Sequence, residues 1–310
     1  MPPRSGRVAV ARVLALAAVL ALGAGCSLVK NKVGSSLAKT GTTFTSDDDP
    51  QLIREAIPFG LKLYESILES VPKNRDLLVA TCSMYTEYAY AYLEGDAAVI
   101  GEARHDEAKA LKDRALNLFL RGRGYCLRAM DTRFPKRREA LLRDPALVVA
   151  KAGKKDIPLL YWTAASWGAA ISARPDDYGI DFPVVRGLME RALALDESAL
   201  HGSLHETMIT IDSLGDALGG SEARAREHFR RAVELQGGTS PGPYVALATG
   251  LSIKNKDRIE FETLLNEALA IDPKADPDRQ LVTILMKQRA RALLDRVDEI
   301  FPKGNGAGRR

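Results

Sequence analysis

The stretch that decides the fold is residues 261–273, FETLLNEALAIDP. Its apolar positions Leu264, Leu265 and Ala268 recur at the spacing of one helix face. Pro273 then ends the helix, because proline lacks a backbone N–H and cannot continue one. The pattern is typical of the second helix of a tetratricopeptide repeat, in which a small residue lets two helices cross closely. It predicts a helical hairpin of that kind.

Helix endings of the same type recur along the rest of the chain. They fall at residues 68–72, 130–135, 194–197, 233–235, 270–273 and 298–302. From Asp196 onward the endings are roughly 40, 36 and 30 residues apart, near the period of a tetratricopeptide repeat, whereas the earlier ones are about 60 apart. No stretch alternates long enough to predict a strand. The sequence therefore predicts an all-α fold of stacked helical hairpins, a tetratricopeptide-like right-handed superhelical array of about 11 or 12 helices.

The N-terminus has the pattern of a bacterial lipoprotein signal. Arg4, Arg7 and Arg12 precede an apolar run at residues 13–22, which is too short to span a membrane, and small residues then lead to Cys26. This order predicts cleavage before Cys26 and attachment of lipid to its sulfur and its new amino group. A plain cleaved signal with an incidental cysteine is the alternative.

These features divide the chain into four segments. They are a signal peptide at residues 1–25, a flexible tether at 26–48, a helical-repeat domain at 49–303 and a disordered tail at 304–310. The domain begins where Asp49 can cap the first helical N–H groups and Pro50 fits the first helical position. We expect a periplasmic protein held to a membrane by lipid, and Ser27 after the cysteine favours the outer membrane.

Net charge and cysteine content bear on possible partners and on disulfide formation. The chain has 44 Lys and Arg against 40 Asp and Glu, and three of the Arg lie in the signal, which leaves 41 basic and 40 acidic residues and no reason to expect nucleic acid. Cys82 and Cys126 each lie in an apolar helical stretch. A buried, reduced state is favoured for both, although a disulfide stays open in an oxidising compartment.

Two groups of aromatic residues are candidates for a ligand cavity. They are Tyr85, Tyr88 and Tyr92 in one stripe, and Tyr161, Trp162 and Trp167 in another. Rings at helical spacing usually fill the space between stacked helices, which is the default interpretation. The alternative is a partly apolar cavity beside Trp162 and Trp167, in which hydroxyl and indole N–H groups orient a ligand.

A local excess of Lys and Arg follows at residues 121–155. Within it, Arg133, Lys136, Arg137 and Arg138 are candidates for contact with an acidic partner protein or with anionic lipid headgroups. A solvated face is the default interpretation of such a cluster.

We find no sequence motif for catalysis or for a cofactor. His201 and His205 share the spacing of one helix face, which can hold a metal, but no further ligand completes a set and packing is favoured. Nucleophile, phosphate-loop and CxxC motifs are missing from the sequence. We therefore expect no enzyme, no cofactor and no metal.

Several segments together resemble one transporter family. They are SDDDP at 46–50, AIPFGLKLYES at 56–66, YTEYAYAY at 85–92, LYWTAASWG at 160–168, Gly219-Gly220, AREHFRRA at 225–232 and DRIEF at 257–261. This combination resembles the tetratricopeptide-type T-component of bacterial TRAP (tripartite ATP-independent periplasmic) transporters. The resemblance covers residues 26–302. Its most specific parts are the acidic segment that ends in proline at 46–50 and the tryptophan-containing segment at 160–168.

The resemblance implies an all-helical periplasmic lipoprotein that binds the solute-binding protein of a TRAP transporter. It further implies a homotrimer with a cavity in each protomer, through which a small ligand, apolar or carboxylate, is handed over for uptake. By this resemblance the main candidates for lining the cavity are Tyr161, Trp162 and Trp167. Weaker candidates are Tyr85, Tyr88 and Tyr92. Two other functions stay open: a helical scaffold lipoprotein for envelope or outer-membrane assembly, and a cell-wall hydrolase on a helical platform.

Overall fold

A computed structural model describes residues 35–36, 42–100 and 104–302 of the chain. The signal peptide, the lipidation of Cys26, most of the tether and the tail at 304–310 lie outside the described residues. Every regular element of the described part is helical, with no strand, which confirms the all-α prediction. Among these helices none is both long and apolar enough to cross a membrane.

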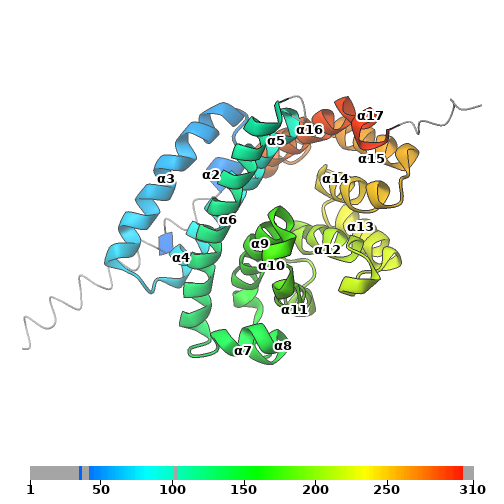
Figure 1. The fold of residues 1–310 in the computed structure, drawn as a ribbon. Coiled ribbons are helices and arrows are strands. Elements are labelled where there is room, and N and C mark those ends of the chain that lie inside the picture. Colours follow the sequence, from blue (N-terminus) through cyan, green and yellow to red (C-terminus); the bar gives the residue numbers. More distant parts are fainter. Residues whose placement is uncertain (1–34, 37–41, 101–103, 303–310) are drawn as a thin grey trace, which may run out of the picture.

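Within the described residues, nine longer helices form the body of the structure (Figure 1). They are α3 (Pro50–Ser70), α4 (Arg75–Tyr88), α6 (His105–Arg133), α9 (Ile157–Ala173), α11 (Phe182–Leu195), α12 (Ser203–Ser213), α13 (Glu222–Leu235), α15 (Arg258–Ala270) and α16 (Gln280–Asp295). Two π-helical segments, η1 (Ala89–Glu94) and η7 (Ala248–Ser252), extend α4 and α14.

Short helices fill many of the connections. They are α2 (Thr42–Thr45), α5 (Gly95–Ile100), α7 (Arg138–Arg143), α8 (Pro145–Val149), α10 (Pro175–Tyr178), α14 (Gly242–Leu247) and α17 (Val297–Ile300). The described residues therefore hold more helical elements than the 11 or 12 expected. Periodicity over one turn is too short a signal to separate such helices from loops.

The helix boundaries follow local chemistry. Asp49 is the N-cap of α3 and accepts hydrogen bonds from the backbone N–H groups of Gln51 and Leu52, with Pro50 at the first helical position. At α15 the Asp257 side chain accepts the N–H of Glu260 in the same way. Each cap satisfies donors that have no partner within the helix, so each fixes where the helix begins.

The helices pack in chain order and then return to their start. Neighbours pack along the series α3, α4, α6, α9, α11, α12, α13, α14, α15 and α16. Helix α16 then packs against α5 and α3, and its Leu281 shares a buried cluster with Ile53 and Leu61 of α3. Just beyond α16, Arg296 Nη1 donates to the carbonyl oxygen of Ala98 at 2.9 Å. The array is therefore closed into a ring (Figure 1).

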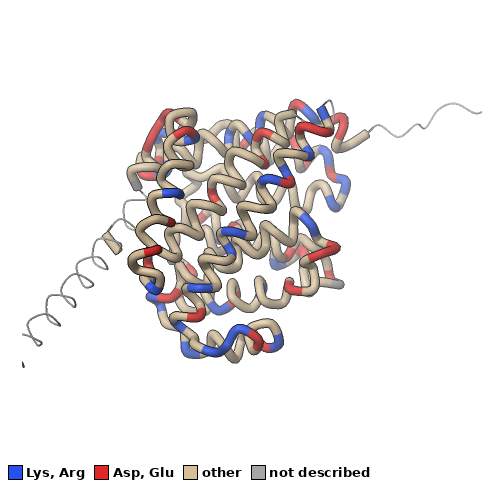
Figure 2. Tube along the Cα trace, turned by 60° about the vertical axis from the view of Figure 1, so that its left-hand side comes forward, with Lys and Arg blue, Asp and Glu red and all other residues tan. Residues whose placement is uncertain are grey.

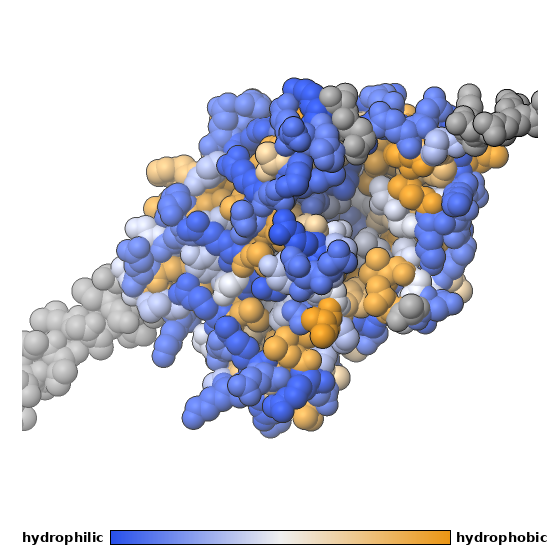
Figure 3. Space-filling view, in the orientation of Figure 1, coloured by the Kyte–Doolittle hydropathy of each residue, from blue (hydrophilic) through white to orange (hydrophobic). Residues whose placement is uncertain are grey.

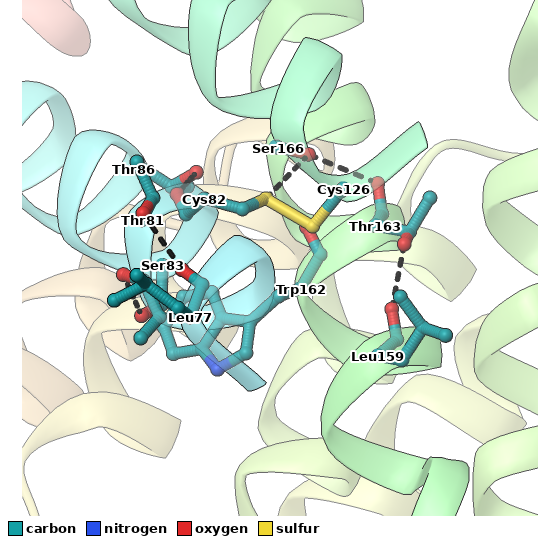
Figure 4. Close-up of a disulfide and its surroundings, with 11 residues drawn as sticks. Leu77, Thr81, Cys82, Ser83, Thr86, Cys126, Leu159, Trp162, Thr163 and Ser166 are labelled. Atoms are coloured by element: carbon teal, nitrogen blue, oxygen red, sulfur yellow. Dashed lines mark hydrogen bonds between the residues drawn. A yellow bond between two sulfur atoms is a disulfide. The ribbon is translucent and has the colours of Figure 1, made fainter. Parts of the chain in front are cut away.

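A disulfide joins α4 and α6, so the expectation of reduced cysteines was wrong. Cys82 and Cys126 are both fully buried and their Cα atoms are 5.5 Å apart (Figure 4). Gly122, one turn before Cys126, explains the approach, because a Cβ there would lie 3.1 Å from the Cys82 carbonyl oxygen. Glycine at this position leaves room for the two helices to cross closely. Sequence spacing alone carries no information on that crossing.

We expect the disulfide to contribute about 3 to 4 kcal/mol to stability, because it closes a loop of 44 residues in the unfolded chain. The double variant Cys82→Ala with Cys126→Ala should lose that amount in urea unfolding. Reductant should lower the unfolding midpoint of the wild type to near that of the variant and leave the variant unchanged. A wild type insensitive to reductant under denaturing conditions would contradict the disulfide.

A carboxylate network holds α3 to α4 and α6. Glu65 Oε1 accepts hydrogen bonds from the hydroxyls of Tyr85 and Tyr125, at 2.7 and 2.8 Å, and pairs with Arg121 at 2.5 Å. Burial by itself would raise the pKa of Glu65. Hydrogen bonds from Lys62, Tyr85, Tyr125 and Arg121 outweigh burial and lower the pKa to about 2.

Acid should weaken this network. Because the folded pKa of Glu65 is about 2 and its ordinary value 4.5, the stabilisation is complete above pH 4.5 and is lost as the pH falls toward 2. Glu65→Gln should cost about 3 kcal/mol at pH 7 in urea unfolding, a difference that shrinks markedly by pH 3. Glu69→Gln, at an exposed position one turn later, is the matched control and should change little. A penalty for Glu65→Gln that is equal at both pH values would contradict this account.

Candidate ligand-binding interior

Four polar side chains from distant parts of the chain are coupled to one another by charge. Glu87 comes from α4, Tyr161 from α9, Glu206 from α12, and Arg279 from the 3-10 turn η9 (Pro277–Arg279) before α16. The charge of Arg279 acts on the pKa of each of the other three. Electrostatic coupling of this kind needs short distances. Closure of the ring is therefore what brings these residues together.

The space around these side chains is both wet and enclosed. The Glu87 side chain is exposed to solvent, and yet burial raises the pKa of its carboxyl to about 7. Burial likewise raises the pKa of Glu206, despite a hydrogen bond from Gln236 Nε2 at 3.1 Å, and that of Tyr161. A group that touches water but is surrounded by protein lies on a concave inner surface. Figure 3 shows this face of the molecule hollowed between α6, α9 and α14.

Tyr161 and Trp162 are the predicted cavity residues nearest to this space. Both are half-buried, and their rings meet edge to face with centroids 4.9 Å apart. Tyr161 is electrostatically coupled to Glu87 and Glu206. The Trp162 backbone carbonyl lies 3.6 Å from Cys82 Sγ, so the disulfide supports this part of α9 (Figure 4). Aromatic surface thus adjoins the charged groups.

Trp167 lies one turn further along α9 and is 4% exposed. Its indole N–H donates to Asp181 Oδ2 at 3.1 Å, and the Arg123 guanidinium covers the ring at 5.1 Å. The indole nitrogen of Trp167 therefore has its hydrogen-bond partner within the packed helices and needs none from a ligand. Little of the ring is left exposed for contact with a ligand.

The three tyrosines of the first stripe are buried. The Tyr85 hydroxyl donates to Glu65, and that of Tyr92 donates to the Pro50 carbonyl oxygen at 3.1 Å. Tyr88 packs against Tyr92 with ring centroids 5.6 Å apart. These rings connect α4 and η1 to α3, and Tyr92 also lines a pocket treated below.

The four candidate basic residues occupy the α6–α7 corner and differ in their contacts. Figure 2 shows Lys and Arg, in blue, spread over the surface among Asp and Glu. Arg133 donates to both oxygens of the buried Asp156, at 2.9 and 3.0 Å, and so belongs to the wall. Arg138 pairs with Asp131 at 2.6 Å. Lys136 and Arg137 are exposed, and no ion pair is seen for either among the described residues. Arg143 of α7 is likewise exposed and without an ion pair in the described part of the chain, so Lys136 and Arg137 are two of the unpaired cations of this corner.

The two candidate histidines do not share a helix face. His201 has a φ of 51° in the 3-10 turn before α12, whereas His205 lies within the helix. His205 Nδ1 is instead 2.8 Å from His228 Nδ1 of α13, and burial lowers the pKa of both imidazoles. Among the described residues no group of three or more His, Cys, Asp or Glu could hold a metal ion.

Sequence reasoning missed the charged residues of the interior. Glu87 stands between Tyr85 and Tyr88 in a mostly apolar run, and an acid in such a run was the available signal. Arg279 lies in a Pro-rich connection where arginine is unremarkable, and only the return of α16 brings it inside the ring.

Comparison with known proteins identifies the family. A family model described as TRAP transporter T-component matches residues 46–301. The chain belongs to the TRAP transporter T-component family. It is also 29% identical over 265 residues to an uncharacterized protein of Treponema pallidum (strain Nichols), covering 83% of this chain and 82% of that protein. A T-component is part of a TRAP transport system, and the family is not an enzyme family. Membership of this family indicates a periplasmic or membrane-associated location.

We expect the Glu87 carboxyl of this T-component to titrate near pH 7, because the enclosed interior hydrates its charge poorly. Carboxyl-region NMR of protein labelled with 13C at the Glu side chain should show one resonance with that midpoint, absent in Glu87→Gln. Glu69→Gln, at an exposed position, is the matched control and should leave that resonance in place. If Glu87→Gln removes a resonance with an ordinary midpoint, the interior is not enclosed.

Proposed function

We propose that this chain binds the periplasmic solute-binding protein of a TRAP-type transporter and helps to hand over a small ligand for uptake. Membership of the T-component family over residues 46–301 is the observation that carries the proposal. No chemistry on the ligand is required of the chain, since transfer needs only a surface that binds and releases it.

The interior supports the ligand part of the proposal. Tyr161 and Trp162 offer half-buried aromatic surface, and Arg279 offers a cation to a carboxylate. Mostly apolar pockets with a few polar groups are the usual form of small-molecule sites. The interior suits a ligand with an apolar body and a charged end.

The location of the chain completes the proposal. Lipid on Cys26 would hold the protein to a membrane, the outer membrane by the preference that Ser27 indicates, and the segment at 26–48 would serve as the tether. A tether raises the local concentration of a partner at that membrane. The buried disulfide between Cys82 and Cys126 suits an oxidising compartment. Assembly as a homotrimer is part of the same proposal.

The α6–α7 corner is our candidate for the partner-facing or lipid-facing surface. Lys136 and Arg137 are exposed there, while the neighbouring Arg133 and Arg138 are held by Asp156 and Asp131. Unpaired surface cations steer association with an acidic surface and lose that effect as salt rises.

The test is crosslinking in the native envelope, recovery through a C-terminal tag and mass spectrometry of the partners. A TRAP-type solute-binding protein should be recovered. Recovery should fall at least fivefold for Lys136→Glu with Arg137→Glu, and stay unchanged for the matched control Arg114→Glu with Lys274→Glu, whose positions are exposed elsewhere on the surface. Recovery of outer-membrane assembly proteins alone would overturn the transport role in favour of a scaffold.

A further inference from the structure

A pocket of about 290 Å³ lies at the seam where the ring closes. One side is formed by α3 and by η1 with α5, and the other by α16 of the C-terminal end. Its apolar wall includes Ala91, Val99, Leu285 and Met286. The volume is that of a site for a small molecule.

The charges in this pocket are not all satisfied by one another. Asp96 is ion-paired with Arg54, and the carboxylate of Asp49 caps α3. Arg289 of α16 has no ion pair among the described residues, and its Nε and Nη1 atoms are buried without a hydrogen-bond partner. A buried donor without a partner costs free energy, and a charged one costs more. Those two atoms have almost no accessible surface, so an anion in the pocket would meet the remaining nitrogen, Nη2, and would balance the charge of the guanidinium.

Tyr90 orients the guanidinium. The Arg289 guanidinium carbon lies 4.6 Å from the centre of the Tyr90 ring, in a cation–π contact that fixes the plane of the charge at the pocket wall. Tyr90 is 38% exposed, and the charges of Arg289, Glu94 and Glu206 act on the pKa of its hydroxyl.

The backbone here is unusual as well. Tyr90, Ala91 and Tyr92 line the pocket and all belong to the π-helical segment η1 (Ala89–Glu94). A π-helical turn is rare and is frequently found at functional sites. It is a second observation, independent of charge, that marks the same place.

We propose that the seam pocket binds a small carboxylate with an apolar body, its carboxylate on Arg289 and its body against Leu285 and Met286. The inference rests on the proposed function and goes beyond it by placing a second carboxylate site at the seam, with Arg289 as its cation, apart from the interior that contains Arg279. An arginine at such a site suits a carboxylate, because a hydrogen bond between two charged groups is stronger than one between neutral groups.

The probe is benzoate, compared with its uncharged isostere benzamide, in calorimetric titration of the full chain in detergent. Benzoate should bind saturably and at least tenfold more tightly than benzamide. Arg289→Gln should weaken benzoate binding at least tenfold and leave benzamide binding unchanged. Arg291→Gln, the same change at an exposed position on α16, is the matched control and should bind like the wild type.

A second variant fills the pocket without touching its charge. Gly95 lines the pocket in a helical conformation, and nothing lies within 4 Å of a Cβ placed there. Gly95→Leu should therefore fold, keep the melting temperature of the wild type and lose benzoate binding. Gly124→Leu, at an exposed position on α6 with equally open surroundings, should keep binding.

Several outcomes would overturn the proposal. They are equal binding of benzoate and benzamide, benzoate binding unaffected by Arg289→Gln and Gly95→Leu, or displacement of benzoate by inorganic phosphate at lower concentration. Failure of the pocket is distinguishable from failure of the transport role. Recovery of a solute-binding protein without benzoate binding would overturn the pocket alone, whereas benzoate binding with recovery of assembly proteins only would overturn the transport role alone.

Discussion

The contact between α16 and the N-terminal helices is the constraint on which the rest of the structure depends. Stacked helical hairpins contact mainly their neighbours, so by themselves they form an open concave surface. Two contacts join the ends of the stack. Leu281 packs in a buried cluster with residues of α3, and Arg296 donates a hydrogen bond to the Ala98 carbonyl oxygen. That junction converts a concave surface into an enclosed space, and the high pKa of Glu87 is its electrostatic consequence.

The buried acids of the walls are paired. Glu65 is held by two tyrosines and Arg121, and the fully buried Asp212 by Arg186 and Arg224. Single buried donors without a partner occur in the walls too, at the Nε atoms of Arg186 and Arg191, but Arg186 still forms an ion pair. Arg289 at the seam has two such donors and no ion pair among the described residues, and it lines a pocket. Unsatisfied polar atoms are costly in a fold and are commonly explained by function.

Local features of the fold could be predicted from the sequence, and features set by distant contacts could not. Asp49 and Pro50 mark the start of α3 and Pro273 the end of the quoted helix, because capping and proline act within one turn. The disulfide depends on the closeness that Gly122 allows between α4 and α6, which no spacing rule contains. Tyr161 and Trp162 were found as aromatic residues on a helix, whereas Arg279 and Arg289 required knowledge of where α16 returns.

The position of the pocket at the seam has a thermodynamic consequence. A ligand there would contact η1 on one side and α16 on the other, so its binding free energy would add to that of closure. A ligand can shift an equilibrium only by its difference in affinity between two states, and a site made from both ends of the array exists only in the closed state. Occupancy and closure would then be linked, and an opening at the seam would release the ligand. A partner that favoured the open array would thereby promote transfer of the ligand without contacting it.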